Sequence, residues 1–179
     1  MFELHLDNVT KRFGPRPVFS NVCAEVRTGE TLVVTGYNGS GKSTLLSVIA
    51  GLLPPDKGSV RYLRDGKELD ADARRRAVGL VAPDLTYYPE LTALENLEFF
   101  ARVRGLAWNA GLAAELLKRV GLEGREKDLV GTFSSGMRVR VKYAIALYTE
   151  PGLLLLDEPT AMLDESGVQI VDSIIQEQK

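Results

Sequence analysis

Cysteine, histidine and long apolar runs are the features that this 179-residue chain lacks or nearly lacks. Its single cysteine, Cys23, cannot form a disulfide within the chain, which fits a reducing compartment. Cys23 lies in an alternating apolar run, so we expect a small, buried side chain there. No stretch approaches the roughly 18 consecutive apolar residues that a membrane-spanning helix needs, and the N-terminus has no basic region followed by an apolar core. We therefore expect a soluble protein whose role at any membrane comes through a partner.

An excess of charge of either sign is also missing. The chain has 22 basic and 24 acidic residues, a formal net charge of -2, which argues against a nucleic-acid-binding surface. The basic run Arg74–Arg76 is short, so we expect a solvated helix face. The length fits a single domain over residues 1–179, with one core and a smaller lobe.

The N-terminal part has the pattern of a sheet. Phe2, Leu4 and Leu6 alternate with polar residues, which predicts a half-buried strand. Further strands are predicted at residues 22–26, 32–35, 58–63 and 78–81. A helix is predicted over residues 42–50, closed by Gly51.

The second half is mostly helical. Thr92 and Glu95 form a capping box that predicts a helix over 92–103, and two further helices are expected at 109–120 and 135–148. These segments predict a helical lobe from about 84 to 148. The apolar run Leu153–Leu156 is bounded by turn residues, which favours a buried parallel strand.

A glycine-rich segment between the strand predicted at 32–35 and the following helix fits the pattern G-x-x-x-x-G-K-[ST]. Glycines let backbone N–H groups converge on one anion, and the helix adds a partial charge of about +0.5. Lys42 is expected near the β- and γ-phosphates, Ser43 on magnesium and Thr44 near the α-phosphate. A glycine-rich turn without a ligand is the alternative. The predicted binding residues are Gly36, Tyr37, Asn38, Gly39, Ser40, Gly41, Lys42, Ser43 and Thr44.

Two carboxylates follow the apolar run of leucines. Asp157 at the carboxyl end of a parallel strand faces the ligand crevice of such a sheet, where it can hold magnesium through water. Glu158 can polarise a water for attack on the γ-phosphate, so Glu158 and Lys42 are the predicted catalytic residues. A plain turn that ends the strand is the alternative.

Together these motifs resemble the ATP-binding-cassette ATPases over essentially the whole chain and in the family's order. Phe133-Ser134-Ser135-Gly136-Met137 looks like the family signature, which implies that Ser134, Ser135 and Gly136 contact ATP held by the opposite subunit of a nucleotide-dependent homodimer. A simple helix N-cap is the alternative. The resemblance implies that Asp164 couples the two sites across the dimer and that Phe13 stacks on adenine; an ordinary core position is the alternative for Phe13.

The implied fold is α/β: a P-loop NTPase core with an N-terminal antiparallel β lobe and an inserted helical lobe. The implied activity is hydrolysis of ATP with magnesium, powering a transmembrane permease subunit from the cytoplasmic face of the inner or plasma membrane. Cargo is left open, with haem exporters of cytochrome c maturation and small drug exporters as the two similar types. A GTPase or small-molecule kinase lacks support, because no [NT]-K-x-D motif is present and neither has a use for the signature.

The chain departs from the family pattern at several positions. Asp84 stands where the family carries a glutamine that senses magnesium, so Asp84 becomes a candidate metal residue with altered chemistry. Tyr37, Ser135 and Met137 replace a proline, a glycine and a glutamine, changes that related exporters tolerate. The switch histidine of the family is expected one strand beyond the C-terminus, because the only histidine, His5, lies in the first strand. We therefore expect a truncated chain, with a non-catalytic, nucleotide-gated interaction module as the rival function.

Aromatic residues gather early in the predicted helical lobe. Phe99 and Phe100 are adjacent, so on a helix they point about 100° apart and cannot both face one core. We expect one of them, or the pair Tyr87 and Tyr88, to be partly exposed in a groove, with Leu91 nearby, that receives a short helix from the membrane subunit. Packing of all five within the lobe is the alternative.

Overall fold

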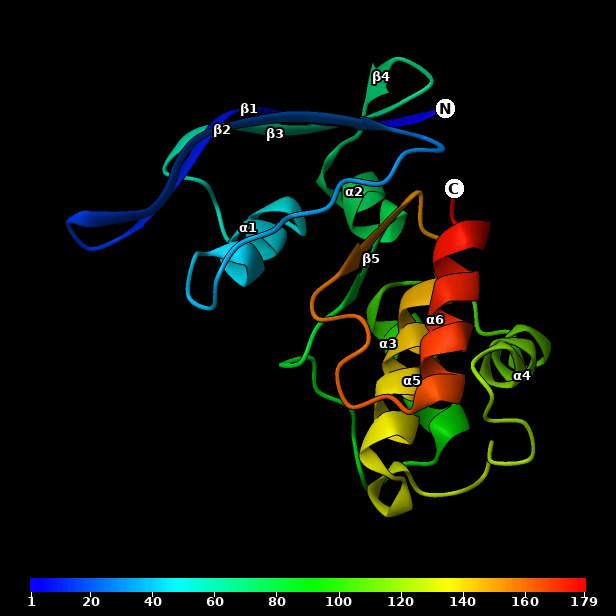
Figure 1. Ribbon diagram of the computed structural model, residues 1–179. Coiled ribbons are helices and arrows are strands. Elements are labelled where there is room, and N and C mark those ends of the chain that lie inside the picture. The colour runs from blue at the N-terminus through cyan, green and yellow to red at the C-terminus, as the bar shows by residue number, and fades with distance from the viewer. The chain divides into compact units, whose positions relative to one another are not determined.

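The computed structural model describes all 179 residues, which form two compact units (Figure 1). The first unit comprises Met1–Val78 with Lys179, and the second comprises Gly79–Gln178. None of the helices is both long and apolar enough to cross a bilayer.

The first unit contains an antiparallel sheet with the strand order β2-β1-β3-β4, which confirms the predicted N-terminal β lobe. The strands are β1 (Phe2–Phe13), β2 (Arg16–Arg27), β3 (Lys57–Arg64) and β4 (Lys67–Glu68). Leu4 of β1 lies opposite Val26 of β2 and Tyr62 of β3, and all three side chains are buried. This register brings the apolar members of the alternating pattern onto one face of the sheet.

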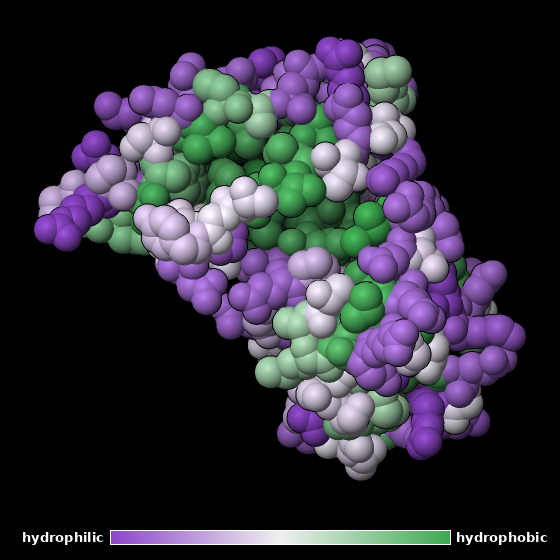
Figure 2. Space-filling view, viewed as in Figure 1, coloured by the Kyte–Doolittle hydropathy of each residue, from purple (hydrophilic) through white to green (hydrophobic).

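Helix α1 (Lys42–Ile49) belongs to the same unit and buries Val48 and Ile49. The hydroxyl of Tyr62 donates to the carbonyl of Ile49, which ties the sheet to the end of the helix, and burial raises the pKa of Tyr62 to about 12. Figure 2 shows apolar side chains gathered over the part of this unit between the sheet and α1. The buried side chains of α1 and the hydrogen bond from Tyr62 therefore hold the helix in place within this unit, which sets the position of its first turn.

Helix α2 (Ala71–Ala77) carries the basic run. Arg75 and Arg76 are exposed, as predicted, whereas Arg74 is half-buried and its guanidinium lies 5.4 Å from the ring centre of Tyr62. Arg75 and Arg76 therefore form the expected solvated face, whereas the guanidinium of Arg74 lies over the ring of Tyr62.

The strand predicted over residues 32–35 is wrong. These residues form no strand, and Val33 is 72% exposed. An apolar run becomes a strand only where a neighbouring strand pairs with its backbone, and no strand of the first unit pairs with this one. The segment that leads into α1 is therefore irregular.

The prediction of a buried Cys23 is also wrong, because its side chain is exposed. The alternation along β2 places Val22, Ala24 and Val26 toward the more buried face, so Cys23 points to the opposite face of the strand. Its sulfur accepts a hydrogen bond from the backbone N–H of Asn8 at 3.3 Å.

The second unit contains the predicted helices within one or two residues. Its elements are β5 (Val78–Val81, beginning at the boundary), α3 (Ala93–Val103), α4 (Ala110–Arg119), a 3-10 turn (Val130–Thr132), α5 (Ser135–Leu147), β6 (Leu153–Leu156) and α6 (Glu165–Glu177). Strands β5 and β6 pair with each other. Helix α6, the 3-10 turn and β4 were not predicted from the sequence, and of α2 only the helical face of Arg74–Arg76 was expected.

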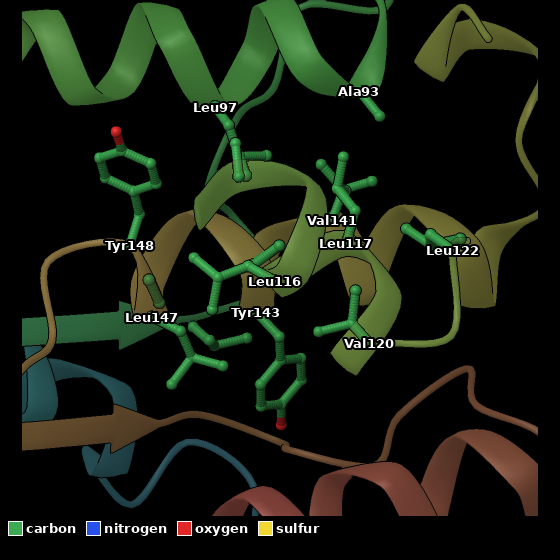
Figure 3. Packing of buried hydrophobic residues seen from close by; sticks show 14 of the residues in the cluster. Ala93, Leu97, Leu116, Leu117, Val120, Leu122, Val141, Tyr143, Leu147 and Tyr148 are labelled. Atoms are coloured by element: carbon green, nitrogen blue, oxygen red, sulfur yellow. The ribbon is translucent and has the colours of Figure 1, made fainter. Parts of the chain in front are cut away.

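Helices α3, α4 and α5 share the core of the second unit. Leu97, Leu117, Val120 and Val141 are each at most 1% exposed, and Figure 3 shows their side chains gathered between the helices, with the ring of Tyr143 at the edge of the cluster. Burying side chains of this size stabilises the unit by ~1.5–3 kcal/mol each. The core therefore holds α5 firmly in place.

Asn96 is a fully buried polar side chain on α3. Its carboxamide oxygen accepts from the N–H of Tyr88 at 2.8 Å, and its nitrogen donates to the carbonyls of Tyr88, Leu91 and Thr92. One side chain therefore provides hydrogen-bond partners for several backbone groups of the loop that precedes α3. The predicted capping box of Thr92 and Glu95 is present beside it.

We predict that Asn96→Ala lowers the free energy of unfolding of the second unit by about 2–3 kcal/mol, because it leaves buried loop groups without partners. Trp108, the only tryptophan, lies in this unit and reports its denaturant unfolding by fluorescence. Asn109→Ala is the matched control: it removes one N-cap hydrogen bond, to Leu112, and costs about 1 kcal/mol. Equal losses in the two variants would contradict the prediction.

Candidate functional site

The phosphate loop is a tight turn that leads into α1. Gly41 caps the helix at φ 95° without a side-chain hydrogen bond, and the first turn has no acidic residue. An added Cβ on Gly41 would lie 2.5 Å from Val18 Cγ1, and one on Gly36 would lie 2.6 Å from Ser40 Oγ. The loop therefore leaves no room for side chains at these glycines, and the N–H groups that begin α1 are available to an anion.

The ammonium of Lys42 is held by the loop itself. Its Nζ donates to the carbonyls of Gly36 at 2.8 Å and of Tyr37 at 3.0 Å. The side chain of Tyr37 is exposed, so the loop uses this residue for its backbone. Ser43 and Thr44 follow in the first turn of α1, and the Ser43 side chain is exposed. One full positive charge thus lies at the mouth of a loop whose backbone already favours anions.

Phe13, at the end of β1, is 60% exposed, so the alternative that it is a core residue is wrong. The ammonium of Lys11 lies 5.7 Å from the centre of its ring and donates to the carbonyl of Pro54 at 2.7 Å. Phe13 therefore offers a free aromatic face in the same unit as the phosphate loop. His5 lies on β1 with its Nε2 3.2 Å from a carboxylate oxygen of Glu3.

Asp157 and Glu158 belong to the second unit and directly follow β6. The N–H of Asp157 donates to the carbonyl of Val81 at 2.8 Å, which prolongs the pairing of β5 and β6. Glu158 has a left-handed backbone with φ 50°, and its side chain is exposed. A sharp turn therefore leads the chain away from the strand and leaves the Glu158 carboxylate exposed to solvent.

The predicted signature residues begin α5. Ser134 is the N-cap, and its hydroxyl accepts from the N–H of Met137 at 3.3 Å, so the capping alternative holds for this serine. Ser135 is the first helical residue, and capping does not account for it. An added Cβ on Gly136 would lie 3.1 Å from the carbonyl oxygen of Met162, so the helix start packs against the segment that precedes α6.

Asp164 is the N-cap of α6. Its carboxylate accepts from the N–H of Gly167 at 2.9 Å and from the hydroxyl of Ser166 at 3.1 Å. These bonds, the one from Gly167 first, hold the pKa of Asp164 below its ordinary value. Asp164 therefore has a structural role in the chain itself, in addition to the role that the family resemblance implies.

Asp84 lies in a loop held by Lys142 of α5, a residue that the sequence analysis missed. Lys142 Nζ donates to the carbonyls of Ala82 at 3.0 Å and Pro83 at 2.6 Å. Burial lowers the pKa of Lys142, and the nearby charge of Asp84 opposes that shift. The sequence offered one signal for this role, a lysine between the apolar residues Val141 and Tyr143. Its hydrogen-bond partners could not be predicted, because they lie about 60 residues earlier in the chain.

A groove with a volume of about 530 Å³ lies beside this loop. It is lined by residues 83–87, Pro89, Gly131, Arg138 and Lys142. The expected aromatic groove is thus found only in part. Tyr87 lines it, whereas Tyr88 forms a separate ring cluster with Phe99 and Phe100, at centroid distances of 4.6–6.2 Å. Tyr88 and Phe99 are partly exposed, as the adjacency argument predicted.

The two units divide the predicted site residues between them. Phe13 and the phosphate loop belong to the first unit; Asp84, the signature residues, Asp157, Glu158 and Asp164 belong to the second. Within the second unit, the start of α5 lies against the segment that leads to Asp164.

Comparisons with known proteins point to one family. The family model described as ABC transporter matches residues 19–161. The linearmycin resistance ATP-binding protein LnrL of Bacillus subtilis is 38% identical over 179 residues, covering 97% of this chain and 57% of that protein. The Fe(3+) ions import ATP-binding protein FbpC of Streptomyces coelicolor is 42% identical over 166 residues, covering 91% and 47%. The cytochrome c biogenesis ATP-binding export protein CcmA of Haemophilus influenzae is 32% identical over 187 residues, covering 99% and 85%.

A solved structure has the same fold. The ATP-binding cassette MJ0796, a dimer in a post-hydrolysis state bound to ADP and Pi, aligns with a TM-score of 0.81 and 31% identity, covering 96% of this chain and 81% of that one. The P-loop NTPase fold predicted from the sequence is therefore confirmed. The chain spans about half the length of LnrL and FbpC.

Proposed function

The chain belongs to the ABC transporter family, and from this membership we propose that it is the ATP-binding and ATP-hydrolysing subunit of a membrane transporter. The observation that carries the proposal is the phosphate loop. A Cβ at Gly36 or Gly41 would meet another side chain at 2.6 Å or less, the loop opens an α-helix that no side chain caps, and its carbonyls hold the ammonium of Lys42. This combination favours a polyphosphate over other anions, because several donors and one full charge converge on one place.

The residues of each unit have separate tasks in this proposal. The backbone of residues 36–44 and the Lys42 ammonium hold the phosphates, and the exposed ring of Phe13 stacks on adenine. The Ser43 hydroxyl and the carboxylate of Asp157 are oxygen donors of the kind that magnesium prefers, and the ion would neutralise charge on the phosphates when bound. Glu158 orients and deprotonates the attacking water.

A second copy of the chain completes the site. The dimeric cassette among the similar structures supports a nucleotide-dependent homodimer. In that dimer, Ser135, Gly136 and the N–H groups at the start of α5 contact the γ-phosphate held by the opposite copy, and Asp164 couples the two sites. Binding of ATP thus joins two copies, and hydrolysis releases them.

The membrane partner docks in the groove of the second unit in this proposal. Tyr87 supplies an aromatic wall, and two cations, Arg138 and Lys142, face one carboxylate, Asp84, in the same lining. From this excess of positive charge we infer a short helix of a transmembrane permease that carries an acidic side chain. The chain then lies on the cytoplasmic face of the membrane. We propose export as the direction, supported by the relatives named for drug resistance and for export, although one relative is named for import.

We predict that Lys42→Ala weakens binding of MgATP by about 100-fold or more, because it removes the only side-chain ammonium in the loop. Titration with a fluorescent ATP analogue measures the dissociation constant. Lys67→Ala, which removes an exposed lysine of β4 in the same unit, is the matched control and leaves the constant unchanged. Unchanged affinity in Lys42→Ala would overturn the phosphate-loop assignment.

Glu158→Gln is expected to retain ATP binding and to trap a stable dimer, because the base is lost while the phosphate contacts persist. Size-exclusion chromatography with MgATP detects the dimer, and phosphate release measures hydrolysis, which falls by about 10²-fold or more. Glu115→Gln, at an exposed position on α4, serves as the control and leaves hydrolysis unchanged. If wild type and Glu158→Gln hydrolyse ATP at the same measurable rate, Glu158 is not the base. If neither protein hydrolyses ATP, the rival function, a non-catalytic module, is supported instead.

Tyr87→Glu should abolish co-purification with the transmembrane permease subunit, while ATP binding is spared, because it places a carboxylate in the wall of the groove. Tyr88→Glu tests the neighbouring ring cluster, which lies outside the groove, and should leave the complex intact. A complex that survives Tyr87→Glu, or one that only Tyr88→Glu disrupts, would show that the partner binds elsewhere.

A further inference from the structure

We propose that Tyr143 is a positioning residue for Glu158, through which helix α5 holds the loop that carries the general base. The inference rests on the proposed function of Glu158 and extends it to a residue that touches no substrate. Tyr143 lies in the middle of α5, one position after Lys142, and nothing in its sequence context indicates a role in catalysis.

Tyr143 is 0% exposed, and its ring is part of the core of the second unit. Its hydroxyl donates to the carbonyl of Pro159 at 2.9 Å. Figure 3 shows the ring pointing out of the helical core toward the loop that follows β6. Burial raises the pKa of the hydroxyl, so it stays protonated and remains a donor. A buried hydroxyl needs such a partner, and here the partner is the residue that follows Glu158.

The backbone of Glu158 needs support from its surroundings. A left-handed conformation at φ 50° is unfavourable for a residue with a side chain and persists where neighbouring groups fix it. The N–H of Asp157 donates to Val81 on one side, and the carbonyl of Pro159 accepts from Tyr143 on the other. Proline has no N–H, so its carbonyl is its only backbone group for such a hydrogen bond. The hydrogen bond from Tyr143 therefore supports Glu158 on its C-terminal side, where Pro159 has no N–H to donate.

Helix α5 contacts the same segment a second time. Gly136, in its first turn, packs so closely against Met162 that an added Cβ would lie 3.1 Å from the Met162 carbonyl oxygen. Gly136 and Tyr143 are seven residues apart and thus lie on one face, two turns from each other. The helix that begins with Ser135 therefore holds both ends of the segment from Pro159 to Met162.

Tyr143→Phe removes only the hydroxyl and is the test. Tyr148→Phe is the matched control, because Tyr148 is also buried, caps the same helix, and uses its hydroxyl to donate to Ala107 and accept from Asn109, away from the Glu158 loop. Thermal unfolding of both variants measures the loss of stability. Amide hydrogen exchange of residues 157–163 measures the order of the loop, and kcat, KM and MgATP affinity measure function.

We expect Tyr143→Phe to speed exchange in residues 157–163 and to lower kcat by about tenfold, with KM and ATP affinity within about twofold of wild type. Tyr148→Phe loses similar stability and changes neither exchange there nor kcat. Equal effects of the two variants, or a fall in kcat without faster exchange in the loop, would overturn the positioning role. Faster exchange with an unchanged kcat would overturn it as well. A wild-type chain that binds ATP but does not hydrolyse it would contradict the proposed function and not the role of Tyr143. In that case amide hydrogen exchange of residues 157–163 alone decides whether Tyr143 orders the loop.

Discussion

The electrostatic demand of a polyphosphate is the constraint on which the rest of the structure depends. Several negative oxygens have to meet converging N–H groups and a cation without intervening side chains. Gly36 and Gly41 meet this demand by leaving no space for a Cβ, and Lys42 meets it by folding back over the loop carbonyls. Such a loop has little stability of its own. The burial of Val48 and Ile49 anchors α1, and the helix in turn fixes the direction in which its uncapped N-terminus points.

The second unit solves a different problem, which is to hold loops that carry charge at the ends of short strands. Helix α5 does so with adjacent side chains that have different surroundings. Lys142 binds the carbonyls of the loop before Asp84, and Tyr143 binds the carbonyl that follows Glu158. Both anchors are side chains of a helix whose buried face also builds the apolar core. The loops that carry Asp84 and Glu158 are therefore both hydrogen-bonded to the helix that begins at Ser135.

Sequence alone predicted the features whose causes lie within a few residues. The alternation in β1, the capping box of α3 and the phosphate loop are such features, because their geometry is set by local periodicity, hydrogen bonding and backbone freedom. It failed for the strand expected at 32–35, which needs a pairing partner, and for Cys23, whose face depends on the register of β2. Lys142 was missed for the same reason, since its partners are distant in sequence.

The departure at Asp84 has a physical compensation that the sequence did not reveal. A carboxylate in place of a glutamine adds a negative charge, which would weaken the binding of a nearby anion if that charge were isolated. Lys142 is half-buried, binds the loop just before Asp84, and lies close enough for its charge to interact with that carboxylate. Its ammonium attracts the charge of Asp84 and donates to two backbone carbonyls of the loop. Because these two hydrogen bonds go to backbone carbonyls, Lys142 holds the loop to α5 whichever side chain stands at position 84, and the charge of Asp84 adds an attraction to the same ammonium.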